Sequence, residues 1–251
     1  MSGLLIWTSI LFMLPSCARK MHQASVQPNL YQIDNNLDTI RSVGNLEGMI
    51  APFRDSMEIE MGSIIGYIES EMPRKQPEST LTHWMGDLTY TAGKKYSGKE
   101  IDFAFLNHGG IRVSYVAAGP ITVGKVFEIM PFDNLLTVLT LTGEEVQMLF
   151  DLIAYKNGGW PVSKQVYVEL DGNEAVNIRI HGEYLKADKL YTVATTSFLA
   201  EGGDGLDFLK KVPRTDYPVF IRDIIIEDIK SKNALGEKIS ATGTGRMVRP
   251  Q

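Results

Sequence analysis

Two glycine-rich loops, each directly after an apolar run, constrain the fold of this chain more than any other feature. Asn107-His108-Gly109-Gly110-Ile111-Arg112 follows the run 101–106, and a second loop, 198–205, follows the run 191–196. Glycine pairs allow the backbone to turn with positive φ and to approach a ligand closely. Both loops are therefore expected at the ends of strands, where they can line one site.

The side chains near these glycines predict the kind of ligand. Asn107 supplies an amide, Arg112 a cationic fork and Asp204 a carboxylate, while Phe132 and Phe198 supply flat apolar faces. A planar heterocycle that carries a hydroxylated or anionic group would use all of these parts. The candidate substrate-binding residues are Asn107, Gly109, Gly110, Arg112, Phe132, Phe198, Gly203 and Asp204.

Each of these features also has a purely structural interpretation. The glycine pairs serve equally well as ordinary turns after strands. Phe132 and Phe198 could be core residues, Asp204 could cap a helix that begins near Gly205, and Arg112 could form a surface ion pair. The residues taken singly leave these alternatives open.

Size and charge narrow the class of protein. With 251 residues, 44% of them hydrophobic, the chain can bury a full core, which favours one domain with appendages. The net charge of -5 argues against nucleic acid as a ligand, because proteins that bind nucleic acid concentrate positive charge.

The N-terminus predicts export. The apolar stretch 4–14 is too short to span a bilayer and leads into Pro15-Ser16-Cys17, where Cys17 is the chain's one cysteine. Its position is typical of a bacterial lipoprotein cleavage site, with a buried or incidental thiol as the alternative. We expect a signal peptide over 1–16, a lipidated tether over 17–31 and a domain over 32–251, anchored to the membrane and facing the periplasm.

Periodicity predicts a mixture of helices and strands. Apolar residues of a stripe that begins at Leu81 indicate a helix starting near Ser79 or Thr80, and Thr142-Gly143-Glu144-Glu145 is a capping box for another. Further helices are expected over 45–57, up to Ile129, and through Val219, Phe220, Ile224 and Ile229 after a turn at 216–218. Strands are expected over 63–68, 101–106, 135–141, 165–170, 176–180 and 190–196.

The order of these elements favours an α+β fold with a mixed β-sheet and packed helices. The helices that separate the strands vary in length, and Asp171-Gly172-Asn173 indicates a hairpin, neither of which fits a doubly wound parallel sheet.

The loops together carry a family resemblance. The motifs 107–112, 119–122, 131–134, 141–143 and 198–205 occur in the order and spacing of the C-terminal, substrate-binding domain of the 5′-nucleotidase and UDP-sugar hydrolase family. The ending Gly245-Arg246-Met247-Val248 is similar to that family's final strand. The resemblance covers about residues 32–248.

The resemblance implies an α+β domain that holds a nucleobase between Phe132 and Phe198. It makes Asn107 and Arg112 polar ligands of the nucleotide and Asp204 the acceptor for the ribose hydroxyls. One departure lies in the helix around Leu81, where the family often carries an arginine or asparagine and this chain reads 82–87 as Thr-His-Trp-Met-Gly-Asp.

In the family that this chain resembles, a separate N-terminal metallophosphatase domain performs the chemistry with two metal ions. This chain has His22, His83, His108 and His181, with no Asp-x-His and no Gly-Asn-His-Glu run. We therefore expect no catalytic or metal-binding residue and no cofactor on this chain, and divalent metals on a partner metallophosphatase.

Two functions follow as alternatives. The chain is the nucleotide- or nucleoside-binding part of a split hydrolase that acts with a separate metallophosphatase chain, or it is a stand-alone ligand-binding or scaffolding lipoprotein without hydrolytic function. An enzyme complete in itself ranks third.

Overall fold

A computed structural model describes residues 46–241 and 243–250. The chain divides into a unit over residues 1–48 and a second, compact unit that begins at Met49 and holds the described sheets. The expected signal peptide (1–16), the tether (17–31), Cys17 and the expected domain start at residue 32 lie outside the described residues.

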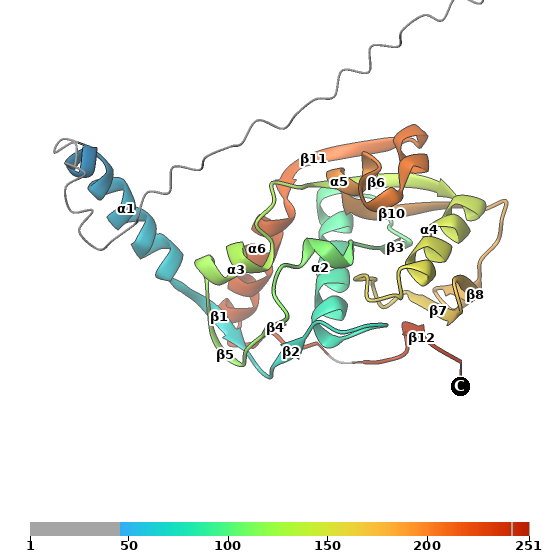
Figure 1. Cartoon of the computed structure of the whole chain (residues 1–251), viewed down its shortest axis with the longest axis horizontal. Helices are drawn as coiled ribbons and strands as arrows, with labels where there is room; N and C mark the ends of the chain where they lie inside the picture. The colour runs from blue at the N-terminus through green and yellow to red at the C-terminus, as the bar shows by residue number, and fades with distance from the viewer. Residues whose placement is uncertain (1–45, 242, 251) are drawn as a thin grey trace, which may run out of the picture. The chain divides into compact units, whose positions relative to one another are not determined.

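The described residues form helices and strands that are mixed along the chain (Figure 1). The helices are α1 (Leu46–Gly62), α2 (Thr80–Ser97), α3 (Val123–Ile129), α4 (Gly143–Tyr155), α5 (Ser197–Ala200) and α6 (Ile221–Ala234). The strands are β1 (Ile64–Ile68), β2 (Met72–Pro73), β3 (Phe103–Ala104), β4 (Tyr115–Val116), β5 (Gly119–Thr122), β6 (Leu135–Thr142), β7 (Val166–Asp171), β8 (Glu174–Ile180), β9 (Glu183–Tyr184), β10 (Leu190–Thr196), β11 (Arg214–Phe220) and β12 (Met247–Val248). Short 3₁₀ turns are η2 (His108–Gly110), η3 (Gly203–Gly205) and η4 (Asp207–Lys211).

The central sheet has the strand order β11-β6-β10-β3. Strands β6, β10 and β3 are buried on both faces, while the edge strand β11 is largely exposed. Alternate residues around β3 enter different cores: Phe103 and Phe105 join one hydrophobic cluster, while Ala104 and Leu106 join the other. Helices α2 and α6 belong to the second of these clusters, and α4 with β7 and β8 belongs to the first. The sheet is therefore the middle layer between two hydrophobic cores.

This sheet is mixed, as the sequence predicts. Strand β10 pairs with β6 in antiparallel fashion and with β3 in parallel fashion. The second four-stranded sheet, β12-β7-β8-β9, contains the expected hairpin, in which Asp171 pairs with Glu174 across the turn at Gly172. The final strand β12 pairs in parallel with β7. The α+β class is confirmed.

The helix starts follow from local capping. The Ser79 side chain accepts a hydrogen bond from the backbone N–H of Thr82, and Thr142 does the same for Glu145, so both helices begin with a capping box. Gly86 explains how closely α2 packs, because a Cβ there would lie 2.3 Å from the backbone oxygen of Val162.

One expectation about the fold is wrong. The segment 216–218 is not a turn, and Val219 and Phe220 are not helical: all five residues lie in β11, an edge strand paired with β6. The pairing register shifts between Tyr217 and Phe220, which places Pro218 at the irregularity, where a residue without an N–H costs no ladder hydrogen bond. Helix α6 begins only at Ile221.

Candidate functional site

A single cavity of about 210 Å³ brings together seven of the eight residues that the sequence nominates. Its lining residues are Asn107, Gly109, Gly110, Arg112, Phe132, Asn134, Phe198 and Asp204. They come from three loops that are far apart in the sequence.

The sheet explains why these loops meet. Strands β3 and β10 are parallel neighbours, so the loops that follow them leave the same edge. Strand β6 runs antiparallel to β10, with Leu136 opposite Thr196, so the segment before β6 lies at that edge too. The positions of Phe132 and Asn134 beside the two glycine loops follow from this topology.

Both aromatic side chains are open to solvent. Phe132 and Phe198 are each 41% exposed, which rules out the interpretation that they are core residues. The Arg112 guanidinium carbon lies 5.8 Å from the centre of the Phe132 ring, and its Nη1 donates to the carbonyl oxygen of Gly109 at 3.2 Å. Within the described part of the chain Arg112 forms no ion pair, so its charge is directed to the cavity and not to a carboxylate.

The polar wall of the cavity is held by one hydrogen bond across the two glycine loops. Asn107, which is 6% exposed, donates from Nδ2 to Oδ2 of Asp204 at 2.7 Å. Asp204 adopts a φ of 55° inside η3 and caps no helix there. The second carboxylate oxygen and the exposed ring faces are groups that a hydroxylated heterocycle could contact.

Gly203 is the nominated residue that does not line the cavity. A Cβ at this position would lie 2.5 Å from the ring of Phe198. The glycine therefore leaves room for the aromatic ring.

The sequence analysis did not nominate three residues that line the cavity or hold its loops in place. Asn134 lines the cavity, and its place two residues after Phe132 in a nominated motif was the available signal. Lys156 donates from Nζ to the backbone oxygen of Asp204 at 2.6 Å. Arg74 donates from Nη1 to the carbonyl oxygens of His108 and Ile111, so it braces the first glycine loop from behind. Neither cation had a sequence signal.

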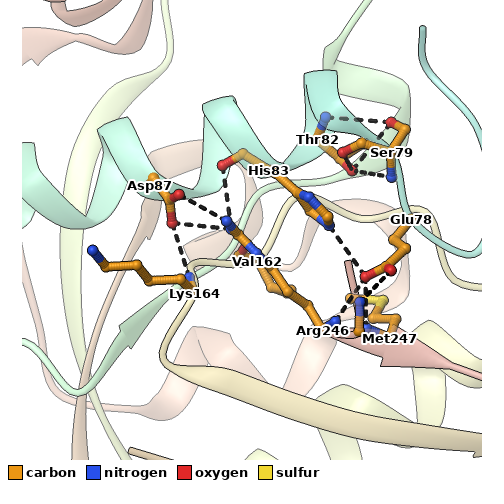
Figure 2. Close-up of polar contacts among 10 residues, drawn as sticks. Glu78, Ser79, Thr82, His83, Asp87, Val162, Lys164, Arg246 and Met247 are labelled. Atoms are coloured by element: carbon orange, nitrogen blue, oxygen red, sulfur yellow. Dashed lines mark hydrogen bonds and ion pairs between the residues drawn. The ribbon is translucent and has the colours of Figure 1, made fainter. Parts of the chain in front are cut away.

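The stretch 82–87 of α2, which departs from the family pattern, forms contacts within the fold. His83 is 2% exposed and its Nε2 lies 3.1 Å from Oε2 of Glu78, as Figure 2 shows. Burial acts to raise the pKa of Glu78, but hydrogen bonds from His83 and from the backbone N–H groups of 245–247 outweigh it. They lower the pKa from its ordinary value of 4.5 to about 2.

Arg246 completes this polar cluster. Its Nη1 and Nη2 donate to the two carboxylate oxygens of Asp87 at 2.9 and 2.8 Å, and Nη1 also donates to the carbonyl oxygens of His83 and Val162 (Figure 2). The cluster fixes the start of β12 against α2, so its charges are used within the fold.

A larger cavity of about 660 Å³ lies beside this cluster. Among its lining residues, Asp87 pairs with Arg246, and Asp228 accepts from Trp84 Nε1 at 3.0 Å and from Lys232 Nζ at 3.1 Å. Four of its five charged lining side chains are therefore paired, and Lys164 is the one without an ion pair among the described residues.

Across residues 46–241 and 243–250, no three His, Cys, Asp or Glu side chains gather into a group that could hold a metal ion. None of the helices described there is both long and apolar enough to cross a membrane.

Comparison with known proteins agrees with the family resemblance of the sequence motifs. A profile described as "5′-nucleotidase, C-terminal domain" matches residues 61–211. The protein UshA of Yersinia enterocolitica is 30% identical over 172 residues, which cover 66% of this chain and 30% of UshA. A 5′-nucleotidase of Vibrio vulnificus is 31% identical over 140 residues, covering 53% of this chain and 24% of that protein.

Solved structures show the same fold. A 5′-nucleotidase precursor from Thermus thermophilus superposes with a TM-score of 0.66 at 22% identity, covering 82% of this chain and 43% of that one. The NAD nucleotidase of Haemophilus influenzae gives 0.62 at 17% identity, covering 83% and 42%. The chain thus spans about a third of the UshA sequence and under half of these structures. The family profile matches residues 61–211, which is more than half of the chain. The chain therefore belongs to the 5′-nucleotidase family and carries its C-terminal domain.

Proposed function

We propose that this chain binds a nucleotide or nucleoside in the 210 Å³ cavity and presents it to a separate metallophosphatase chain. The observation that carries the binding half is the convergence of three distant loops on one cavity with two exposed phenylalanine rings. Stacking of a base on an aromatic ring contributes about 1–3 kcal/mol and tolerates different bases.

The polar groups assign the remaining roles. Asp204, with one carboxylate oxygen held by Asn107, accepts hydrogen bonds from the ribose hydroxyls. Arg112 is the cation among the lining residues and is placed to meet an anionic group. The cavity is smaller than the 300–1,000 Å³ typical of complete ligand pockets, so it suits one part of a nucleotide, with the rest left accessible to a partner.

The catalytic half of the proposal rests on the family. The matched region is a C-terminal domain, and the chain spans about 30% of UshA. In-line displacement at phosphorus by two metal ions needs several protein ligands around each ion. We assign those ligands and the divalent metals to the partner chain.

A thermal-shift screen over nucleosides, nucleotides and nucleotide sugars tests the binding half. A ligand that binds only the native state raises the melting temperature by mass action, so at least one of these compounds should do so. No shift at millimolar concentration of any of them would refute nucleotide binding.

We also propose that Cys17 carries the lipid that holds the chain to the membrane on the periplasmic side. The motif 14–17 supports this assignment. Cys17→Ala should move the protein from the membrane fraction to the soluble fraction without changing its melting temperature. Absence of incorporated palmitate in the wild-type chain would contradict it.

A further inference from the structure

Helix α1 presents an apolar face that has no partner within the described residues. Met49, Phe53 and Met57 recur every four residues, with Ile50 beside them, so they share one side of the helix. Their side chains are 61%, 74% and 58% exposed, and Ile50 is 45% exposed. Such contiguous apolar patches on a soluble surface mark sites of interaction.

The face is continuous with the domain core at one end. Met61, the next residue in the series of four, packs against the hydrophobic cluster that contains α2 and α6. From Gly48 to Glu60, by contrast, every residue except Ala51 is exposed. An isolated helix of this length is only marginally stable in water, because most helical stability in proteins comes from packing of the apolar face.

The charges on α1 indicate which kind of surface can cover its apolar face. The helix carries Arg54 against Asp55, Glu58 and Glu60 among its described side chains, and residues 46–62 contain no lysine. An interfacial membrane helix usually has lysine and arginine on its polar face, and anionic lipid headgroups would repel this one. The sequence of the helix contains four acidic residues and one arginine, so two copies would bring eight carboxylates together with two guanidinium groups, which disfavours self-pairing.

We propose that α1 docks its Met49, Ile50, Phe53 and Met57 side chains into an apolar groove with a basic rim on the separate metallophosphatase chain. This inference rests on the proposed function and names its interface. A helix with anchors four residues apart fits the helix-in-groove mode of recognition, and methionine side chains adapt to irregular surfaces. The residues matched to the family begin at Met61, in the last turn of the helix, so most of α1 precedes them.

The experiment uses the full-length chain and the purified metallophosphatase encoded in the same cell. Affinity is measured by biolayer interferometry for the wild type and for Phe53→Gln, Met57→Gln and Ile59→Gln. Ile59 is the matched control, because it is 78% exposed on the same helix but lies on the opposite side from Met57 and about 120° around the helix from Phe53. Glutamine keeps the helix propensity, so all three variants should retain the wild-type melting temperature.

We expect Phe53→Gln and Met57→Gln each to weaken binding by about tenfold or more, as buried anchors of an interface do, and Ile59→Gln to leave it within about twofold. Equal losses at all three positions, or no binding of the wild-type chain, would overturn the docking claim. So would a wild-type dimer in sedimentation that Phe53→Gln dissociates, or binding to phosphatidylglycerol vesicles that the same change abolishes.

Failure of the proposed function has a different signature. If the mixed proteins hydrolyse nucleotide and Phe53→Gln binds as tightly as wild type, the docking claim fails and the proposed function stands. If the two chains bind through α1 but the mixture hydrolyses no nucleotide, the docking claim stands and the proposed function fails.

Discussion

The two cavities of this domain differ in how many of their charged side chains are paired within the fold and in whether aromatic rings are exposed beside them. The larger one, about 660 Å³, has five charged lining side chains. Asp87 pairs with Arg246 and Asp228 with Lys232, while Lys164 forms no ion pair within the described residues. The smaller one, about 210 Å³, has two exposed phenylalanine rings and an arginine without an acidic partner among the described residues. Volume alone would favour the larger cavity, whereas the exposed phenylalanine rings and the arginine without an acidic partner are the reason why we propose the smaller one as the ligand site.

The largest effect is expected at Arg246. Arg246→Met should destabilise the fold by about 3–5 kcal/mol, because it removes the guanidinium that donates to Asp87 and to two buried carbonyl oxygens. Urea unfolding measures the change. Arg249→Met, which removes an exposed hydrogen bond to Asn157, is the control and should stay within about 0.5 kcal/mol. Similar losses in both variants would show that the buried cluster is not special.

The next effect concerns acid. The folded pKa of Glu78 is about 2, below its ordinary 4.5, so its contribution to stability is complete above pH 4.5 and is lost as the pH falls through 2. The shift corresponds to about 3 kcal/mol. Glu78→Gln should be less stable than wild type at pH 7, and the gap should narrow below pH 4.5. A gap that stays constant from pH 7 to pH 2.5 in urea unfolding would contradict this account.

Substitutions in the small cavity should lower the affinity for nucleotide and leave the free energy of unfolding nearly unchanged. Phe132→Ala and Phe198→Ala should each weaken nucleotide binding by about 1–3 kcal/mol in calorimetry, because each removes a stacking surface. Since both rings are 41% exposed, the free energy of unfolding should change little. A stability loss of about 3–5 kcal/mol would identify these residues as core after all.

The smallest effect is one of selectivity. Asp204→Asn retains the shape of the side chain but replaces an acceptor by a donor, so the preference for a ribose over a 2′,3′-dideoxyribose should fall by about 1 kcal/mol. Competition binding with the two nucleosides measures it. Unchanged discrimination would remove the ribose assignment from Asp204.

The sequence predicts the smaller cavity better than the larger one, and the reason is physical. Glycine pairs after apolar runs report local backbone geometry, and two such loops on parallel neighbouring strands must share a sheet edge. Seven nominated residues therefore line one cavity. Glu78 and Arg246, in contrast, are joined only by the fold across 168 positions, and nothing local marks either as a partner.

The prediction for Val219 and Phe220 was wrong, and Lys156 was missed, because contacts between residues far apart in the sequence decide both places. Val219 and Phe220 fit a helical stripe with Ile224, but pairing with β6 keeps them extended, and tertiary contacts override the local pattern. Gly203 was nominated as a glycine of the second loop; it does not line the cavity, and the ring of Phe198 lies in the space that it leaves. Lys156 reaches Asp204 from the end of α4, a contact that sequence spacing cannot indicate.

The most direct test of the central claim is a crystal structure of this chain grown with adenosine 5′-monophosphate. The account predicts the adenine ring between Phe132 and Phe198, with the ribose hydroxyls at Asp204 and the larger cavity empty of nucleotide. Ordered nucleotide beside Trp84 and Arg246, with the two phenylalanine rings unoccupied, would contradict it.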